Sequence, residues 1–390
     1  MSEFKVYQPL YYKKFQCTGS SCRSNCCGHN WQIRIDKSTY GKYRSLDDET
    51  GRELIDNIKI YSQEPFIANM VMDSEGNCHF LDEKGLCSIQ KKLGYDYLSR
   101  TCRIHPRSIS FIAGEFETYL HLSCEEAVKV VLFEKNIMKF EEAAPELDGD
   151  GNFLPNRLLA MEKYTTAENA VEIFWKLRST SLVIMQSRQY SVRIRMLILC
   201  LFIERINAMF EAGRDAEVAL FADGFSESMY TKDYNSLALQ MSDGVTLKAD
   251  IVLDILTEIE TTKDAQFNTV FARALEGLDI SPVSKKLPAD FHENYAKHYD
   301  LYFSDKEYIF ENYIVNHVMM DGFPFDYKNE TGGVKKNFAD LLVKYNLIEF
   351  LLVGACRYSM KFDKRSIIDC VSAFSRKYDH SLKGYLKTDF

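Results

Sequence analysis

The sequence predicts a mainly α-helical protein with a cysteine-rich, loop-rich N-terminal module that contains a few short strands. Three observations carry this prediction. Eight of the eleven cysteines lie at or before residue 124, apolar residues recur near a 3.6-residue period beyond residue 165, and an acidic stretch with Pro and Gly separates the two regions. We therefore predict a cysteine-cluster module over residues 1–138 and an all-helical domain over residues 156–390.

Short strands, helices and loops alternate in the N-terminal region. Alternation of apolar and polar residues predicts a strand over 31–36, and four apolar positions predict a helix over 47–61. A loop-rich stretch follows over 65–106. Residues 111–121 then predict a strand hairpin that turns at an Ala-Gly pair, and 124–135 predict a helix with acidic residues in its first turn.

Residues 139–155 are acidic, carry two prolines and two glycines, and are predicted to form a linker. Beyond them the apolar periodicity predicts a succession of helices. They are expected over 166–188, 190–212, 246–262, 264–278, 288–303, 305–320, 334–353 and 363–378. Cys200 and Cys356 lie among apolar residues of this region, so we expect both to be packing residues.

Composition and charge exclude several classes of protein. The 46% of hydrophobic residues suffices for a sizeable core, and the net charge of −8 argues against nucleic-acid binding. The longest strongly apolar run, 196–203, is far shorter than the about 20 residues that a membrane span needs. No secretory signal is visible, so a cytoplasmic protein is expected, and its oligomeric state is left open.

The cysteines of the first 124 residues point to a metal centre. Disulfides are rare in reducing compartments, where clustered cysteines more often bind metal or do chemistry. Thiolates bind soft transition metals and iron–sulfur clusters. The predicted metal ligands are Cys17, Cys22, Cys26, Cys27, Cys78, Cys87, Cys102 and Cys124.

The spacing of these cysteines leaves the kind of metal open. It matches neither the common zinc fingers nor the two common ferredoxin patterns. Cys22-x3-Cys26 begins the C-x3-C-x2-C run of radical S-adenosylmethionine enzymes, but His29 stands at its third position. Zinc and iron–sulfur, one centre and two, and the choice of four ligands therefore all stay open.

Several stretches of the first 130 residues resemble a known family. The series from Cys78 through Gly85-x-Cys87 to Cys102-Arg103 is similar to bacterial cysteine-cluster proteins that are thought to bind iron–sulfur or zinc. Residues 15–33, 93–103 and 122–127 more closely resemble the flagellin lysine-N-methylases. This resemblance implies methyl transfer from S-adenosylmethionine to lysine ε-amines of flagellin. It also implies an iron–sulfur centre on the N-terminal cysteines, expected as one or two 4Fe-4S clusters.

Arg103 and His105 follow Cys102 and are the predicted cofactor-binding residues. They would bind the carboxylate of the cofactor or tune the cluster by hydrogen bonding. In the alternative interpretation, Arg103 and Arg107 only neutralise the thiolates. No glycine-rich loop follows a strand as in dinucleotide-binding folds, and no residue type singles out a catalytic base. A second functional hypothesis is a non-enzymatic metal-cluster protein, either a redox sensor or a zinc-stabilised adaptor.

Overall fold

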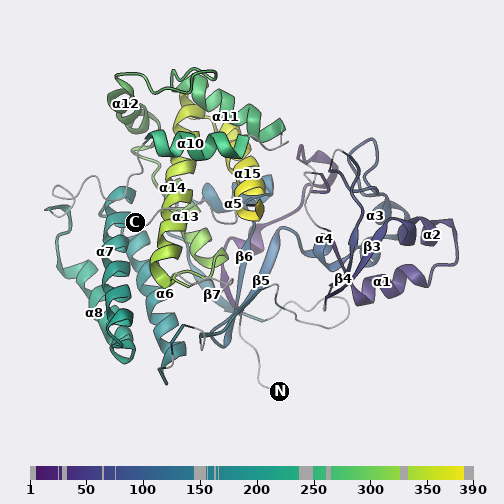
Figure 1. Ribbon diagram of the computed structural model, residues 1–390, viewed down its shortest axis with the longest axis horizontal. Coiled ribbons are helices and arrows are strands. Elements are labelled where there is room, and N and C mark those ends of the chain that lie inside the picture. The colour runs from purple at the N-terminus through teal and green to yellow at the C-terminus, as the bar shows by residue number, and fades with distance from the viewer. Residues whose placement is uncertain are drawn as a thin grey trace.

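Figure 1 shows the computed structural model of the chain, in which helices dominate and short strands gather in two sheets. The structure describes residues 6–381 apart from 25, 29–32, 64–65, 75, 145–154, 156, 162–163, 166, 237–248, 261–264 and 326–332. The prediction of a mainly α-helical chain with a few short strands is confirmed. Within the described ranges, every helix is too short or too polar to cross a lipid bilayer.

A three-stranded sheet with the order β2-β4-β3 organises the cysteine-rich region. The strands are β2 (Arg34–Asp36), β3 (Ile58–Gln63) and β4 (Phe66–Met70). The helices of this region are α1 (Lys37–Arg44), α2 (Glu49–Asp56), α3 (Ser88–Leu93) and α4 (Arg100–Ile104). Two 3-10 turns, η2 (Gly19–Ser21) and η3 (Tyr95–Tyr97), also belong to it. Their buried residues form what we call the small core: Ile33, Ile35, Tyr43, Leu54, Ala68, Met70, Cys78, Phe80, Ile89 and Leu98.

The helix predicted over 47–61 is wrong in its second half. α2 ends at Asp56, and Ile58 and Ile60 lie in β3, where they pair with Met70 and Ala68 of β4. These two β-branched residues alternate with polar ones, which suits a strand as well as a helix over so short a run. The strand predicted over 31–36 is present as β2, and residues 31 and 32 lie outside the described residues.

A second sheet has five strands in the order β7-β1-β6-β5-β8. They are β1 (Val6–Pro9), β5 (Arg107–Ile112), β6 (Glu115–Leu120), β7 (Phe140–Ala143) and β8 (Arg157–Leu159). β5 and β6 form the predicted hairpin, and Gly114 at its turn has a φ of +84°, which favours glycine. β7 lies in the stretch predicted as a linker, most of which falls outside the described residues.

The main core joins this sheet to the helices. It includes Tyr11, which follows β1, Leu120 of β6, and Val128 of α5 (Glu125–Leu132), together with Phe174 and Leu351 of the helical region. Figure 1 shows the sheet lying against the helices, with the cysteine-rich region to one side. The main core therefore crosses the boundary predicted between residues 138 and 156, and that division stays a prediction.

The helices predicted beyond residue 165 are confirmed within a few residues at each end. They are α6 (Ala170–Gln186), α7 (Val192–Glu211), α10 (Ala249–Glu260), α11 (Ala265–Gly277), α12 (Phe291–Phe303), α13 (Tyr308–Met320), α14 (Gly333–Tyr358) and α15 (Lys364–Ser381). In this region the prediction omitted α8 (Val218–Thr231) and the 3-10 turn η5 (Asp215–Glu217). In the N-terminal region it also omitted the 3-10 turn η1 (Tyr12–Lys14). Cys356 is buried and Cys200 packs against the main core, as expected.

Two glycines allow α11 and α14 to approach each other closely. A Cβ on Gly354 would lie 2.5 Å from the carbonyl oxygen of Ala274, and one on Gly277 would lie 2.0 Å from that of Gly354. Both obstacles are backbone atoms of a packed helix, so neither can move aside alone.

We expect Gly354→Ala to lower the free energy of unfolding by about 1–3 kcal/mol, because it overpacks this contact. The matched control is Gly224→Ala on α8, where a Cβ would meet nothing within 4 Å. That substitution should raise the free energy of unfolding by about 0.5–1 kcal/mol through helix propensity. Urea unfolding of both variants measures the difference, and effects of the same sign would contradict the close contact.

Candidate metal and cofactor site

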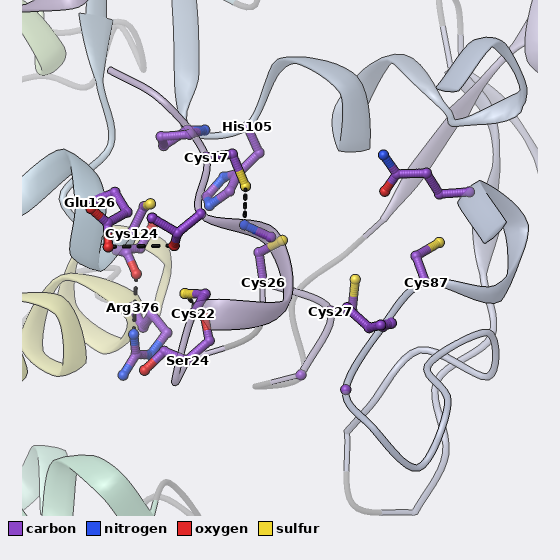
Figure 2. A pocket seen from close by; sticks show the side chains of 18 of the residues that line it. Cys17, Cys22, Ser24, Cys26, Cys27, Cys87, His105, Cys124, Glu126 and Arg376 are labelled. Carbon is purple, nitrogen blue, oxygen red and sulfur yellow. Dashed lines mark hydrogen bonds between the residues drawn. The ribbon is translucent and has the colours of Figure 1, made fainter. Parts of the chain in front are cut away.

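One cavity of about 170 Å³ lies where the cysteine-rich region meets α5 and α15. Six cysteines line it: Cys17, Cys22, Cys26, Cys27, Cys87 and Cys124. Figure 2 shows their side chains around this cavity, with Cys124 on the side of α5 and Cys27 and Cys87 on the side of the cysteine-rich loops. Six of the eight predicted ligands are thus brought to one place by segments up to about a hundred residues apart.

The two remaining predicted ligands belong to the small core. Cys78 is buried in it, and Cys102 packs against its edge, as do Cys27 and Cys87. The Cys78 amide donates to the carbonyl oxygen of Cys27 at 2.7 Å, which fixes these two segments to each other. Cys124 instead packs against the main core. The predicted ligands therefore pack against two different cores, and cysteines from both of these sets line the cavity.

The ionisation of the thiols differs across the site. A hydrogen bond from the Cys27 thiol lowers the pKa of Cys26 to about 7, and the same bond, with burial, raises the pKa of Cys27. Burial is also the largest cause that raises the pKa of Cys22, Cys78, Cys87, Cys102 and Cys124. Cys26 therefore loses its proton more readily than these thiols, and the thiolate is the form that binds metal.

The donor chemistry of this cavity suits a soft metal or an iron–sulfur cluster, because thiolates are the preferred ligands of both. Among the described residues, no three His, Cys, Asp or Glu side chains are arranged so that they could already hold a metal ion. The eight cysteines therefore stay predicted ligands. His29, the departure from the radical-enzyme spacing, lies outside the described residues.

The structure separates the two predicted cofactor-binding residues. His105 lines the cavity, whereas Arg103 is not among the lining residues that the structure describes. The backbone of Arg103 is engaged elsewhere: its amide donates to the carbonyl oxygen of Ser99, and its own carbonyl accepts from the Tyr95 hydroxyl at 3.2 Å. Of the pair, His105 has the position that cofactor binding requires.

A charged residue from the far end of the chain completes the wall, and reasoning from the sequence alone did not find it. Arg376 of α15 lines the cavity, and its two terminal nitrogens donate to the carbonyl oxygen of Ser123 at 3.1 Å and to Gln266 at 2.6 Å. Glu126 of α5 also lines it. Arg376 is more than 240 residues from the nearest lining residue in sequence, on an ordinary amphipathic helix, so only the fold reveals its role.

Glu125 ties the cysteine segment to the helical region beside this cavity. The Ser24 hydroxyl donates to Oε1 of Glu125 at 2.6 Å, and Arg365 of α15 donates to both carboxylate oxygens at 2.7 and 3.1 Å. Burial raises the pKa of Glu125, but hydrogen bonds from Arg365 and Ser24 and the nearby positive charges outweigh it, so the pKa is lowered. A lowered pKa means that the bound, ionised form stabilises the fold.

Arg365→Ala should therefore lower the free energy of unfolding by about 1–2 kcal/mol near pH 7, because it leaves a buried carboxylate with fewer partners. The stabilisation from a lowered carboxyl pKa is present above the unfolded value of about 4.3 and is lost as pH falls through the folded value. We expect the difference from the wild type to shrink below about pH 4 in urea unfolding. A difference that is unchanged by pH would show that the Glu125 charge is not involved.

By its fold and site, this is a mainly helical protein with a cysteine-rich region whose thiols gather at one cavity. Residues 178–387, more than half of the chain, match the protein family described as FliB lysine N-methylase C-terminal domain. The chain therefore belongs to the FliB lysine N-methylase family. Arg376 lies within the matched residues, on the wall that faces the thiols.

Curated relatives from Salmonella agree with this family. The chain is 34% identical over 145 residues to proteins named lysine-N-methylase from Salmonella typhimurium and Salmonella choleraesuis, a stretch that covers 36% of this chain and 36% of each relative. It is also 34% identical over 145 residues to the flagellar biosynthetic protein FliU of Salmonella muenchen, of which 85% is covered. The match thus spans about a third of the length of the two methylases. No solved structure matches the chain.

Proposed function

We propose that this protein is a cytoplasmic enzyme that transfers methyl groups from S-adenosylmethionine to lysine ε-amines of flagellin, with an iron–sulfur centre held by the N-terminal cysteines. One observation carries the proposal. The thiol-lined cavity lies between the cysteine-rich region and α15, which belongs to the stretch that matches the lysine N-methylase domain. The name of the FliU relative supports a flagellar protein as substrate.

The proposed chemistry assigns distinct tasks to the cofactor and to the protein. S-adenosylmethionine would supply the methyl group: the bond between this group and the positively charged sulfur breaks as a bond to the lysine nitrogen forms. The sulfur leaves as a neutral thioether, and the methylated amine releases a proton. The amine must be neutral to attack, and the ordinary lysine pKa of about 10.4 lies well above neutrality. Apolar side chains packed around the amine would lower that pKa by desolvation. Four of the eight predicted cysteine ligands, six of which line the cavity, would hold such a cluster.

Anaerobic purification tests the metal part of the proposal. We expect a brown protein with matched iron and sulfide, and Cys26→Ser should lose most of the visible absorption because Cys26 is the readily ionised thiol at the cavity. The control is Cys200→Ser on α7, a half-buried thiol outside the cavity-lining residues, which should keep the colour. A colourless wild-type protein with stoichiometric zinc would overturn the iron–sulfur assignment and favour a zinc-stabilised adaptor.

The methyl-transfer part needs a second measurement. The metal-loaded protein is incubated with flagellin and S-adenosylmethionine, and the mass of flagellin is recorded. We expect increases by multiples of one methyl group, located on lysines. Loaded protein that leaves the flagellin mass unchanged would contradict the proposed enzyme and favour a non-enzymatic cluster protein.

A further inference from the structure

We propose that Glu125 is a positioning residue of the metal centre. Its carboxylate holds the segment with Cys22 and Cys26 near Cys124, so that thiols from both places bind one centre. All three cysteines line the cavity, and Figure 2 shows their side chains around it. This role rests on the proposed metal site, and it adds which thiols share a centre and which side chain brings them together.

The thiol side chains must turn when the metal binds. Among the described residues, no three possible ligands are yet arranged to hold an ion. What the fold can fix in advance is therefore the position of the backbone segments that carry the thiols. A contact that joins two such segments shortens the search for a common centre, because less chain entropy is lost when the ligands gather.

Ser24 connects the cysteine segment to Glu125. It lies between Cys22 and Cys26 in the sequence, and its hydroxyl donates to Oε1 of Glu125 at 2.6 Å. The side-chain oxygen of Gln266 lies further from this hydroxyl, at 3.4 Å. A hydroxyl has one proton to donate, so the shorter bond to the ionised acceptor dominates. The Cys22 thiol in turn donates to the carbonyl oxygen of Ser24 at 3.0 Å, which ties this thiol to the same residue.

Glu125 is anchored on the side of the helical region. It follows Cys124 directly and is the first residue of α5. Arg365 of α15 donates to both of its carboxylate oxygens at 2.7 and 3.1 Å, and Asp369, one turn further along α15, holds the same guanidinium at 2.6 Å. Ile368 of α15 is buried in the main core. Glu125 thus joins a short loop to a packed helix, as the hydrogen-bonding partners of metal ligands do in other sites.

A second contact of the same kind is weaker. The hydroxyl of Thr18, which follows Cys17, donates to Oε1 of Glu126 at 3.5 Å. The side chain of Glu126 is 17% exposed, whereas that of Glu125 is 3% exposed. A shorter hydrogen bond to a more buried carboxylate is the stronger one, because water competes less for both partners. The contact from Ser24 therefore controls where the cysteine segment meets α5.

The test measures how fast bound metal leaves the full-length protein after anaerobic loading. The metal released to a chelator is assayed over time, so that iron and zinc can be read alike. Ser24→Ala should speed release about tenfold to a hundredfold, as is typical when a hydrogen-bonding partner of a metal site is lost. Glu125→Gln should do likewise, because its amide lacks the charge that both donors bind. The double variant should add less than about twofold to either, since both changes remove one contact.

Two variants separate positioning from a general loss of structure. Ser24→Thr keeps the hydroxyl and should stay within about threefold of the wild type. Glu134→Gln is the matched control: this carboxylate also binds the N-terminal segment, through Lys14 at 2.6 Å, but lies outside the cavity-lining residues. It should release metal like the wild type. Helical content by circular dichroism reports that every variant is folded.

Alkylation of Cys124, followed by mass spectrometry, tests whether this thiol shares the centre. It should be slow in the loaded wild type and at least about tenfold faster in loaded Ser24→Ala, because a thiol bound to metal is shielded from reagent. Equal rates in the loaded and the metal-free wild type would overturn the shared centre.

The remaining outcomes distinguish the positioning role from the proposed function. If Ser24→Ala and Glu125→Gln release metal at the wild-type rate, or if Ser24→Thr releases it as fast as Ser24→Ala, the positioning role is wrong while the proposed function stands. Wild-type protein that binds no metal would instead overturn the proposed metal centre, and the positioning role with it.

Discussion

Replacing Arg178 with methionine should lower the free energy of unfolding by about 3–5 kcal/mol, because it leaves a buried carboxylate without its cation. Arg178 lies on α6 and Glu117 on β6, and both side chains are at most 1% exposed. Nη1 of Arg178 donates to both carboxylate oxygens at 2.7 Å, and Nε donates to the carbonyl oxygen of Phe323 at 2.5 Å. One side chain thus joins the helices, the five-stranded sheet and the segment after α13.

A surface ion pair provides the control for this prediction. Arg214 and Glu217 lie 2.5 Å apart, but their side chains are 49% and 55% exposed. Water screens such a pair, so Arg214→Ala should leave the free energy of unfolding nearly unchanged. Urea unfolding of the two variants near pH 7 gives both values. If both substitutions lowered the free energy of unfolding by similar amounts, burial would not be the reason that the Arg178–Glu117 pair stabilises the fold.

The pH dependence of the Arg178→Met variant gives a further check. Burial raises the pKa of Glu117, and the Arg178 guanidinium opposes this rise. Without the arginine the folded pKa should rise further above the unfolded value of about 4.3. The native state then holds its proton longer, so the variant should lose stability relative to the wild type as pH rises above about 4. The gap between the two proteins is expected to be smaller near pH 4 than near pH 7.

The helical part of the fold could be predicted because its signals are local. The ends of helix α7 lie close to the ends of the apolar periodic stretch in the sequence. At its start, the hydroxyl of Ser191 accepts a hydrogen bond from the amide of Ile194. The hairpin of β5 and β6 is equally local, since its two strands are joined by one turn. Periodicity and turn residues suffice wherever the partners of an element are its neighbours in sequence.

The five-stranded sheet could not be predicted as a whole, because its pairing is not local. β1 pairs with β7 across more than 130 residues, with Val6 opposite Ala143. β1, β7 and β8 have only three or four residues each, too few for a period-2 pattern to stand out. Helix α8 was not predicted for another reason. Its apolar residues Leu220 and Tyr230 are exposed, so the apolar positions of the helix do not mark a single buried face.

The site was predictable in residue type but not in arrangement. An excess of cysteine among polar loop residues indicates metal chemistry without any geometry. Spacing in sequence could not distinguish Cys78 and Cys102, which belong to the small core, from Cys124, which packs on the main core. Nor could it find Arg376, because a single arginine on an amphipathic helix is normally a surface residue. Tertiary packing alone decides which charged side chains meet the thiols.

Removing the metal from the proposed thiolate site should lower the protection of small-core amides against hydrogen exchange while leaving the main core intact. Among the residues that the structure describes, the small core has ten buried members, one of which is Cys78, and Cys27, Cys87 and Cys102 pack against it. So few apolar residues rarely hold a fold of this length without a crosslink. A metal bound to these thiolates would supply the crosslink, because metal binding to such a module stabilises its folded form directly.

Hydrogen–deuterium exchange before and after treatment with a chelator measures this effect. Protection of the amides in β3 and β4 should fall by more than about a hundredfold, whereas those of α14, in the main core, should change little. Cys78→Ser should reproduce the loss without a chelator, and Cys200→Ser should not. If β3 and β4 keep their protection in the metal-free protein, the small core is stable by packing alone, and the metal then serves the cavity and its chemistry rather than the fold.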